Sequence, residues 1–142
     1  MSVNEAKEEA QVIIEEFSFL DDWEDRYQLL IDQGRKLADF PSHYRDDDHR
    51  LRGCQSVVYF SNFFNPNGTI TFVANSDAAI VQGLIALMLK VFSEKKPQEI
   101  IDTNINFLEK IGLDEHLSPT RKNGLSSLIY SIKNVAKLKL SQ

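Results

Sequence analysis

Two short segments rich in β-branched and aromatic residues, separated by a turn sequence, constrain the fold of this 142-residue chain more than any other feature. Residues 56–64 read SVVYFSNFF and residues 69–74 read TITFVA, with Asn-Pro-Asn-Gly between them. Such a pattern is typical of a β-hairpin. Residues 49–53 alternate long polar and apolar side chains, which predicts a further strand. We therefore expect a short antiparallel sheet with Cys54 near the bend between its first two strands.

Helical periodicity flanks the predicted sheet on both sides. A first helix is expected over about residues 4–17, burying Ala6, Val12, Ile13 and Phe17, and a second from Asp22 to about residue 34. After the sheet we expect a helix capped by Ser76 or Asp77, short helices over 97–101 and 105–111, and a final helix that begins at Ser118 and Pro119. This order indicates an α+β fold, in which helices pack on one face of a small antiparallel sheet. No linker or repeat divides the sequence, so residues 1–142 are expected to form a single domain.

The charge and the apolar segments exclude several classes of protein. The net charge of −5 argues against a nucleic-acid partner and gives no attraction to an anionic membrane. The most apolar stretch, residues 78–92, contains Gln82, Gly83 and Lys90 and is too short to span a bilayer. The first 25 residues hold nine acids and one base, unlike a secretory signal or a transit peptide. We therefore expect a cytoplasmic protein without a membrane span.

The charges are distributed unevenly along the chain. Residues 119–142 hold five bases and no acid, which is the opposite of the N-terminal segment. Two interpretations stay open: two solvated helix faces, whether or not they are neighbours in space, or a surface on which a partner docks.

The single cysteine, Cys54, is the sharpest chemical constraint. It allows no internal disulfide and no site built from several thiolates, and it suits a reducing compartment. A lone cysteine is often a small buried hydrophobe. Here, however, Gly53 suits an exposed bend, and His49, Arg50 and Arg52 favour the nucleophilic thiolate. The three acids at 46–48 oppose the positive field of these residues. A core role and a reactive role for Cys54 therefore both stay open.

Other chemistries find little support in the sequence. A thiol hydrolase needs a positioned base, but His43, His49 and His116 lie in no recognised signature. The histidines lack metal-ligand spacing, and residues 46–48 lack the glycine and distal glutamate of a calcium loop. We expect neither a metal nor a cofactor bound by this chain.

Two charged residues near predicted helix starts are candidates for contact with a partner. Arg121 stands three residues after the Ser118 cap, where a capping box would have Glu or Gln, and a cation there opposes the helix dipole. This cost is either simply tolerated, or Arg121 faces an anion or an acidic group of a partner. Asp77 is favourable at a helix start, and that structural role is compatible with exposure to a partner.

Three segments resemble the conserved blocks of the SufE/CsdE family of sulfur acceptors. Residues 52–56, Arg-Gly-Cys-Gln-Ser, resemble the block with Gly-Cys-Gln-Ser at its core. Residues 76–84 (SDAAIVQGL) and 116–125 (HLSPTRKNGL) are similar to the second and third blocks. The order and spacing also match from Trp23 to the end of the chain, while the long acidic opening is less typical of the family.

The resemblance implies a fold similar to that of the IscU scaffold proteins and makes Cys54 the sulfur acceptor. It places Asp77 and Arg121 at positions associated with the cysteine loop and with docking of a desulfurase. Arg52, Gly53, Gln55 and His116 belong to the same blocks and are expected to support the site or the docking.

The resemblance also implies the partners of the chain. They are a cysteine desulfurase of the SufS or CsdA type, which carries its own pyridoxal phosphate, and a downstream scaffold complex of the SufBCD type. The chain would stimulate the desulfurase as an accessory protein and would not be an enzyme. The alternative is a protein that holds an iron–sulfur cluster itself. Homodimerisation and the choice between SufE-type and CsdE-type partners are left open.

Overall fold

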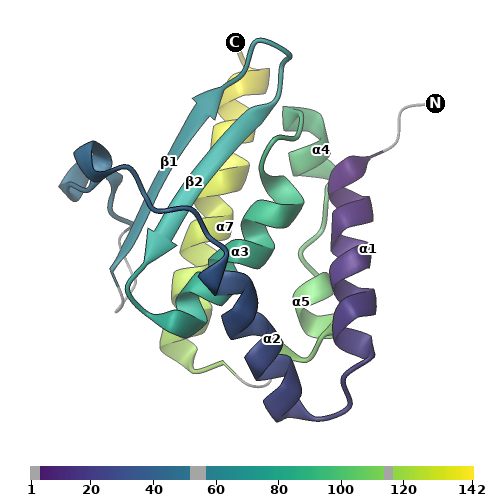
Figure 1. Cartoon of the computed structure of the whole chain (residues 1–142). Coiled ribbons are helices and arrows are strands. Elements are labelled where there is room, and N and C mark those ends of the chain that lie inside the picture. The colour runs from purple at the N-terminus through teal and green to yellow at the C-terminus, as the bar shows by residue number, and fades with distance from the viewer. Residues whose placement is uncertain (1–3, 52–56, 114–116) are drawn as a thin grey trace.

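The computed structural model describes residues 4–51, 57–113 and 117–142. The elements in chain order are α1 (Glu5–Ser18), α2 (Trp23–Arg35), the 3-10 turns η1 (Ser42–Tyr44) and η2 (Asp47–His49), β1 (Val58–Phe64), β2 (Ile70–Ser76), α3 (Ala79–Phe92), α4 (Pro97–Asp102), α5 (Phe107–Lys110) and α7 (Pro119–Leu140). Figure 1 shows α7 behind the two strands and α3 beside β2, with α1 and α5 on the side of α3 away from the sheet. The predicted α+β architecture, a small antiparallel sheet with helices on one face, is confirmed.

The sheet is the predicted hairpin. Val58 of β1 pairs with Ser76, and Phe64 pairs with Ile70, in one uninterrupted antiparallel register. Gly68 has φ +88°, a left-handed conformation that glycine adopts at little cost and that the Asn-Pro-Asn-Gly turn requires. The hairpin turn and the alternation of core-facing and outward-facing residues therefore determine the register of the sheet.

The prediction of a strand over residues 49–53 is wrong for residues 49–51, the part that the structure describes. His49 ends the turn η2, and only Arg50 pairs with the sheet, through an isolated antiparallel bridge to Tyr59. The Asp46 carboxylate accepts a hydrogen bond from the His49 backbone N–H at 3.1 Å. This side-chain cap stabilises a turn at the position where an extended strand was expected.

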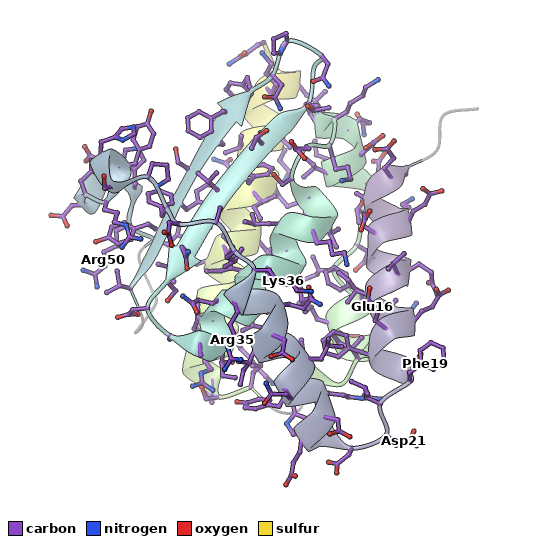
Figure 2. The ribbon with its side chains drawn as sticks, viewed as in Figure 1. Glu16, Phe19, Asp21, Arg35, Lys36 and Arg50 are labelled. Carbon is purple, nitrogen blue, oxygen red and sulfur yellow. The ribbon has the colours of Figure 1, made fainter. Side chains whose placement is uncertain are left out.

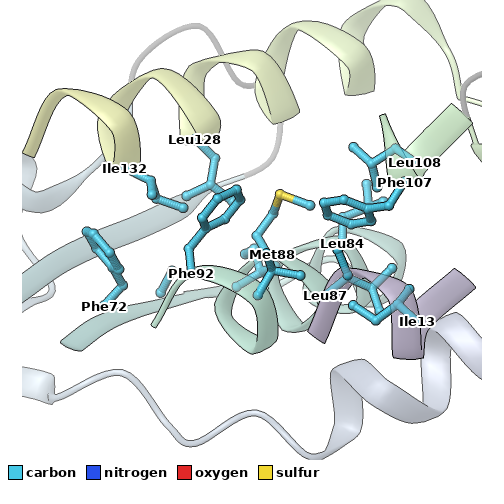
Figure 3. Packing of buried hydrophobic residues seen from close by; sticks show 14 of the residues in the cluster. Ile13, Phe72, Leu84, Leu87, Met88, Phe92, Phe107, Leu108, Leu128 and Ile132 are labelled. Atoms are coloured by element: carbon cyan, nitrogen blue, oxygen red, sulfur yellow. The ribbon is translucent and has the colours of Figure 1, made fainter. Parts of the chain in front are cut away.

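The core lies between the sheet and the helices. Figure 3 shows Phe72 of the sheet, Phe92 of α3 and Ile132 of α7 around the same interior. Residues alternate along β2, so that Ile70, Phe72 and Ala74 are all buried. The opposite face of the sheet is covered by the segment that follows α2. There the rings of Phe40 and Tyr59 stack at 5.7 Å, and those of Tyr44 and Phe63 meet at 5.9 Å.

The helix predictions hold with two corrections. In α1 the buried residues are Ala6, Ala10, Ile13 and Phe17. Val12 is 40% exposed because its position falls on the opposite side of the helix. The second correction concerns α3, whose N-cap is Ala78 without a side-chain bond. Ser76 is still paired in β2, so neither it nor Asp77 caps this helix.

Helices α2 and α3 cross at a pair of glycines. A Cβ added to Gly83 would lie 2.4 Å from the carbonyl oxygen of Leu30, and one added to Gly34 would lie 2.6 Å from the Gly83 nitrogen. No side chain fits between backbones this close. The two glycines therefore fix how near α2 approaches α3, and so the position of the first turns of α3.

Lys133 of α7 joins the last helix to α4. Its ammonium donates hydrogen bonds to the carbonyl oxygens of Ile100, Ile101 and Thr103, at the C-terminal end of α4, and lies 5.0 Å from the centre of the Phe92 ring. Burial lowers the pKa of Lys133, and the charge of Asp102 partly opposes that shift. A cation here satisfies carbonyl groups that a helix end leaves without partners.

Among the described residues, no helix has both the length and the apolar character needed to cross a membrane.

Candidate functional site at one end of the sheet

The predicted site residues fall into two groups. Arg52, Gly53, Cys54, Gln55 and His116 lie outside the described residues, and their roles stay predictions. Asp77 and Arg121 lie within the described part of the chain, as do both ends of the segment that carries Cys54. These neighbours define the site geometrically.

The chain enters and leaves the Cys54 segment at the same end of the sheet. The Leu51 N–H donates to the Val58 carbonyl oxygen at 2.8 Å, beside the bridge between Arg50 and Tyr59. Val58 in turn pairs with Ser76, the last residue of β2. Adjacent strands lie about 5 Å apart, so the anchors of the Cys54 segment and the turn from β2 to α3 are immediate neighbours.

Asp77 lies exposed in that turn, and the residues around it are held by a polar network. The Gln82 side chain donates to the Ser76 carbonyl oxygen at 2.7 Å and to Asn75 Oδ1 at 3.2 Å. Asn75 Oδ1 also accepts from the Ser76 N–H, and Asn75 Nδ2 donates to the Ala38 carbonyl oxygen at 3.0 Å. The turn is therefore fixed from both α3 and the segment that follows α2.

Sequence reasoning missed Asn75 and Gln82 as positioning residues. Asn75 is only 9% exposed, and its amide makes all of its bonds to neighbouring chain segments. Buried amides are retained where every donor and acceptor can be satisfied. The signal that could have found this network is Gln82 itself, a polar residue among the otherwise apolar first turns of α3.

The acids before the Cys54 segment are partly engaged. Asp46 Oδ1 lies 2.7 Å from His49 Nδ1, and this hydrogen bond lowers the pKa of Asp46. His43 instead packs its ring against Tyr44, with ring centres 4.2 Å apart. The Asp46–His49 pair resembles the base and orienting group of a hydrolase, but among the described residues no nucleophile is hydrogen-bonded to either histidine.

Arg121 lies in the first turn of α7, where Ser118 is the N-cap and Pro119 the first helical residue, as predicted. Its guanidinium donates to the hydroxyl of Tyr27 on α2 at 3.3 Å. Within the described residues it makes no ion pair with Asp77 or any other acid. Among the residues that the structure describes, Arg121 is thus an exposed cation without an acidic partner, at a helix end whose dipole favours anions.

The acidic and basic ends of the chain lie on different sides of the molecule. Helix α1 packs against α3, α4 and α5, whereas α7 packs against α4 and α3. Figure 1 shows α1 farthest from the sheet and α7 directly behind it. The acidic face of α1 and the basic face of α7 are therefore not neighbours, although Arg121 at the start of α7 contacts Tyr27 of α2, two residues after the acidic segment ends at Asp25.

Figure 1 also shows the starts of β1, α3 and α7 at the same, lower end of the molecule. This end combines the anchors of the Cys54 segment, the exposed carboxylate of Asp77 and the exposed guanidinium of Arg121. A partner that approached this end would meet charges of both signs beside the anchors of the cysteine segment. Among the described residues, no three metal-ligating side chains gather into a cluster.

Comparison with known proteins identifies relatives over almost the whole chain. Residues 11–136 match the family described as "SufE: Fe-S metabolism associated domain". An uncharacterized SufE-like protein of Rhizobium meliloti is 42% identical over 134 residues, covering 90% of this chain and 94% of that protein. A second, from Rhizobium etli, is 38% identical over 131 residues, covering 89% and 88%.

A solved structure supports the fold independently. The solution structure of a hypothetical protein from Thermus thermophilus superimposes with a TM-score of 0.77 at 19% identity, covering 94% of this chain and 97% of the other. At this identity the likeness concerns the fold alone. The family match and the two relatives confirm the resemblance drawn from the three sequence blocks: the chain belongs to the SufE family, and its role lies in iron–sulfur metabolism.

Proposed function

We propose that Cys54 accepts a persulfide sulfur from a cysteine desulfurase and passes it on to iron–sulfur cluster assembly. One observation carries the proposal: the only cysteine of a SufE-family chain lies in a segment whose two ends are anchored side by side at one end of the sheet. A protein with a single cysteine can hold one sulfur covalently but lacks the several thiolates that usually bind a cluster.

The transfer step is a thiol–disulfide type of exchange. The Cys54 thiolate attacks the outer sulfur of the desulfurase Cys–S–SH group, and a new S–S bond forms to Cys54. The S–S bond on the desulfurase breaks, and its cysteine leaves as a thiolate. Sulfur and its proton move together, so the step needs no external oxidant or reductant.

The surrounding structure supports such a step in two ways. The network of Asn75, Gln82 and Ser76 fixes the neighbouring turn, so the partner meets a pre-organised surface and little ordering is needed on docking. The Asp46–His49 hydrogen bond engages one of the three acids that precede the cysteine segment. When His49 carries its proton, this ion pair cancels one of those negative charges and reduces their opposition to a Cys54 thiolate.

Asp77 and Arg121 would then contact the desulfurase directly. Both are exposed, they lie at the end of the molecule where the Cys54 segment is anchored, and they carry opposite charges. Complementary charges on the partner would steer docking and set its orientation. In this proposal the pyridoxal phosphate belongs to the desulfurase, the SufE-family chain acts as its accessory protein in the cytoplasm, and a SufBCD-type complex receives the sulfur.

Intact-mass spectrometry tests the proposal. The protein is incubated with an active SufS-type or CsdA-type desulfurase, pyridoxal phosphate and cysteine, in parallel with the Cys54→Ser variant. We expect a gain of about 32 Da per sulfur that is reversed by a reducing thiol and absent from the variant, as exchange at a single thiolate requires. The same samples, assayed for sulfide release, should show stimulation of the desulfurase by the unmodified protein alone.

Two outcomes would count against this function. Stimulation that persists with Cys54→Ser would mean that the chain activates the desulfurase without carrying sulfur. No mass gain with a demonstrably active desulfurase would instead favour the cluster-binding alternative. A visible absorption spectrum after reconstitution with iron and sulfide would then reveal that alternative.

A further inference from the structure

One cavity of the molecule takes no part in the candidate functional site. It lies between α1 and the connection from α4 to α5 and has a volume of about 260 Å³. Figure 1 shows α1 beside both of these short helices, with α3 between α1 and the sheet. Ligand cavities begin at about 300 Å³, so this one suits a small molecule of on the order of ten non-hydrogen atoms.

The floor of the cavity is apolar. Ala10 of α1 and Phe107 of α5 are buried, and Ile14 packs against the same core. Thr103 also lines the cavity, but its hydroxyl already donates to the Glu99 carbonyl oxygen at 2.6 Å. A bound molecule would therefore meet a preformed hydrocarbon surface, which favours an apolar body over a strongly hydrated one.

Two exposed lysines line the cavity, Lys7 from α1 and Lys110 from the end of α5. Among the residues that the structure describes, neither ammonium group forms a salt bridge or a hydrogen bond. Asn104 adds a further donor, because its Oδ1 accepts from the Asn106 N–H at 2.8 Å and its Nδ2 is left for a ligand. Free donors beside an apolar floor are complementary to a negatively charged group that carries a hydrocarbon body.

The charge of the lining residues indicates a single negative charge on the ligand. Among the described residues that line the cavity, Asp102 is the one acid, and its carboxylate already accepts from Gln98 Nε2 at 2.9 Å. Two lysines and one aspartate leave the lining with a formal charge of +1. A monoanion neutralises that charge, whereas a dianion would place an excess negative charge beside Asp102.

We infer that this cavity binds a small apolar carboxylate. Its carboxylate group accepts hydrogen bonds from Lys7 and Lys110, whose long side chains reach toward it from α1 and α5. Its hydrocarbon body, aromatic or branched aliphatic, packs on the floor formed by Ala10, Ile14 and Phe107. Lys7 and Ile14 are seven residues apart on α1, about 10 Å along the helix, which gives such a body room to lie parallel to α1.

A bound carboxylate would tie α1 to the connection from α4 to α5. Since the cavity lies on the side of α3 away from the sheet, the anchors of the Cys54 segment stay accessible to a partner. Binding here does not depend on the proposed sulfur transfer, and a failure of one leaves the other standing.

NMR titration of the whole chain with phenylacetate tests the inference. This probe joins one carboxylate to an aromatic body of about the required size. We expect the backbone amide signals of residues 7–14 and 102–110 to move with a dissociation constant of about 1 mM or lower, as for small ligands with few polar contacts. The midpoint of thermal unfolding should rise with the phenylacetate concentration, because the ligand binds only the folded chain.

Three related probes separate the charge from the hydrocarbon body. 2-Phenylethanol keeps the ring without the charge and should bind at least about tenfold more weakly, because the charge-assisted hydrogen bonds are lost. Acetate keeps the charge without the ring and should give no saturable shift. Phenyl phosphate should bind more weakly than phenylacetate, because its second charge meets Asp102. Tighter binding of phenyl phosphate would overturn the assignment of a carboxylate.

Lys7→Gln and Lys110→Gln should each raise the dissociation constant of phenylacetate at least about threefold. Lys36→Gln is the matched control, since it removes the same charge from an exposed lysine that does not line the cavity. Figure 2 shows Lys36 at the end of α2. Circular dichroism should show that all three variants are folded, and the control should bind like the parent.

Three results of these titrations would overturn the inference. The first is no saturable shift of the lining residues at about 10 mM phenylacetate, which is about ten times the expected constant. The second is equal binding of 2-phenylethanol. The third is unchanged binding in both Lys7→Gln and Lys110→Gln.

Discussion

The two turns that flank β2 are built in contrasting ways. The hairpin turn before it is local: Asn65 Nδ2 donates to Thr69 and Thr71, and the Thr69 hydroxyl donates to Asn67, all within six positions of sequence. The turn after β2 is held by residues far apart in the chain, since Asn75 bonds to Ala38 at a separation of 37 residues. Local bonds are enough to reverse the chain. The turn beside the cysteine segment is tied to several parts of the fold, which gives a partner a fixed surface to meet.

The largest effect should come from the glycine crossing that positions α3. Gly83→Ala places a Cβ against the Leu30 backbone, which cannot move aside as a side chain can. We expect the free energy of unfolding to fall by about 3 kcal/mol, measured by urea denaturation. Gly68→Ala in the hairpin turn is the matched control. No atom lies within 4 Å of its added Cβ, and only the φ of +88° opposes it, at about 1 kcal/mol. Equal losses at the two glycines would contradict the contrast between a tightly packed helix crossing and an open hairpin turn.

The next largest effect should come from the polar network that joins Gln82, Asn75 and Ser76. Gln82→Met keeps the side-chain length but leaves the Ser76 carbonyl oxygen without its 2.7 Å donor, at a cost of about 1–2 kcal/mol. Sulfur transfer to Cys54 should also fall, because the neighbouring turn loses its support. Gln98→Met is the control, since that exposed amide bonds only to Asp102 one turn away, and its loss should cost less than about 0.5 kcal/mol. If the Gln82 variant were as stable as the Gln98 variant, the network would have no positioning role.

Arg121→Ala should separate docking from stability. The side chain is exposed, and its charge opposes the dipole at the start of α7, so the free energy of unfolding should change by less than about 0.5 kcal/mol. Affinity for the desulfurase, measured by isothermal titration calorimetry, should fall severalfold. Tyr27→Phe removes only the hydroxyl that receives the Arg121 hydrogen bond. Weakened binding in this second variant would show that Tyr27 positions the guanidinium, and unchanged binding in Arg121→Ala would reject the docking role.

The smallest effect concerns pH. Because the hydrogen bond from His49 lowers the pKa of Asp46, the folded chain holds that proton less tightly than the unfolded chain. The resulting stabilisation is present above the ordinary carboxyl pKa of about 3.9 and is lost as the pH falls through the lower folded value. Carbon-13 NMR titration should show Asp46 titrating below the ordinary carboxyl pKa of about 3.9, and His49→Ala should reduce that shift by removing its largest cause. An ordinary pKa for Asp46 in the parent protein would contradict this assignment.

The hairpin and most helices could be predicted because their signals are local. The Asn-Pro-Asn-Gly turn and the Ser118-Pro119 helix start each lie within a few residues, and the structure has both. The errors arose where local groups compete. At residues 46–49 a side-chain cap favours a turn over a strand. At Ser76 the sheet continues to the position where a helix cap was expected.

The chemistry of the candidate site could be predicted from the sequence, but the contacts that hold its neighbouring turn in place could not. Cys54 stands out as the only thiol, and the three sequence blocks led to the family. The close approach of Gly34 to Gly83 and the bond from Asn75 to Ala38 join segments that are distant in sequence. The hydrophobic periodicity of the sequence does not indicate such pairs, because they form only when helices and strands pack together.

The hydrogen bonds of Lys133 bear on how the chain matures during synthesis. The C-terminal carbonyls of α4 receive this ammonium from a residue that the ribosome adds some thirty positions later. Leu128 and Ile132 of the same helix also close the core. A nascent chain that has not reached α7 therefore exposes both an apolar surface and unsatisfied carbonyls. Because translation proceeds at about 5–20 residues per second, this incomplete state lasts for seconds, during which a chaperone can bind it.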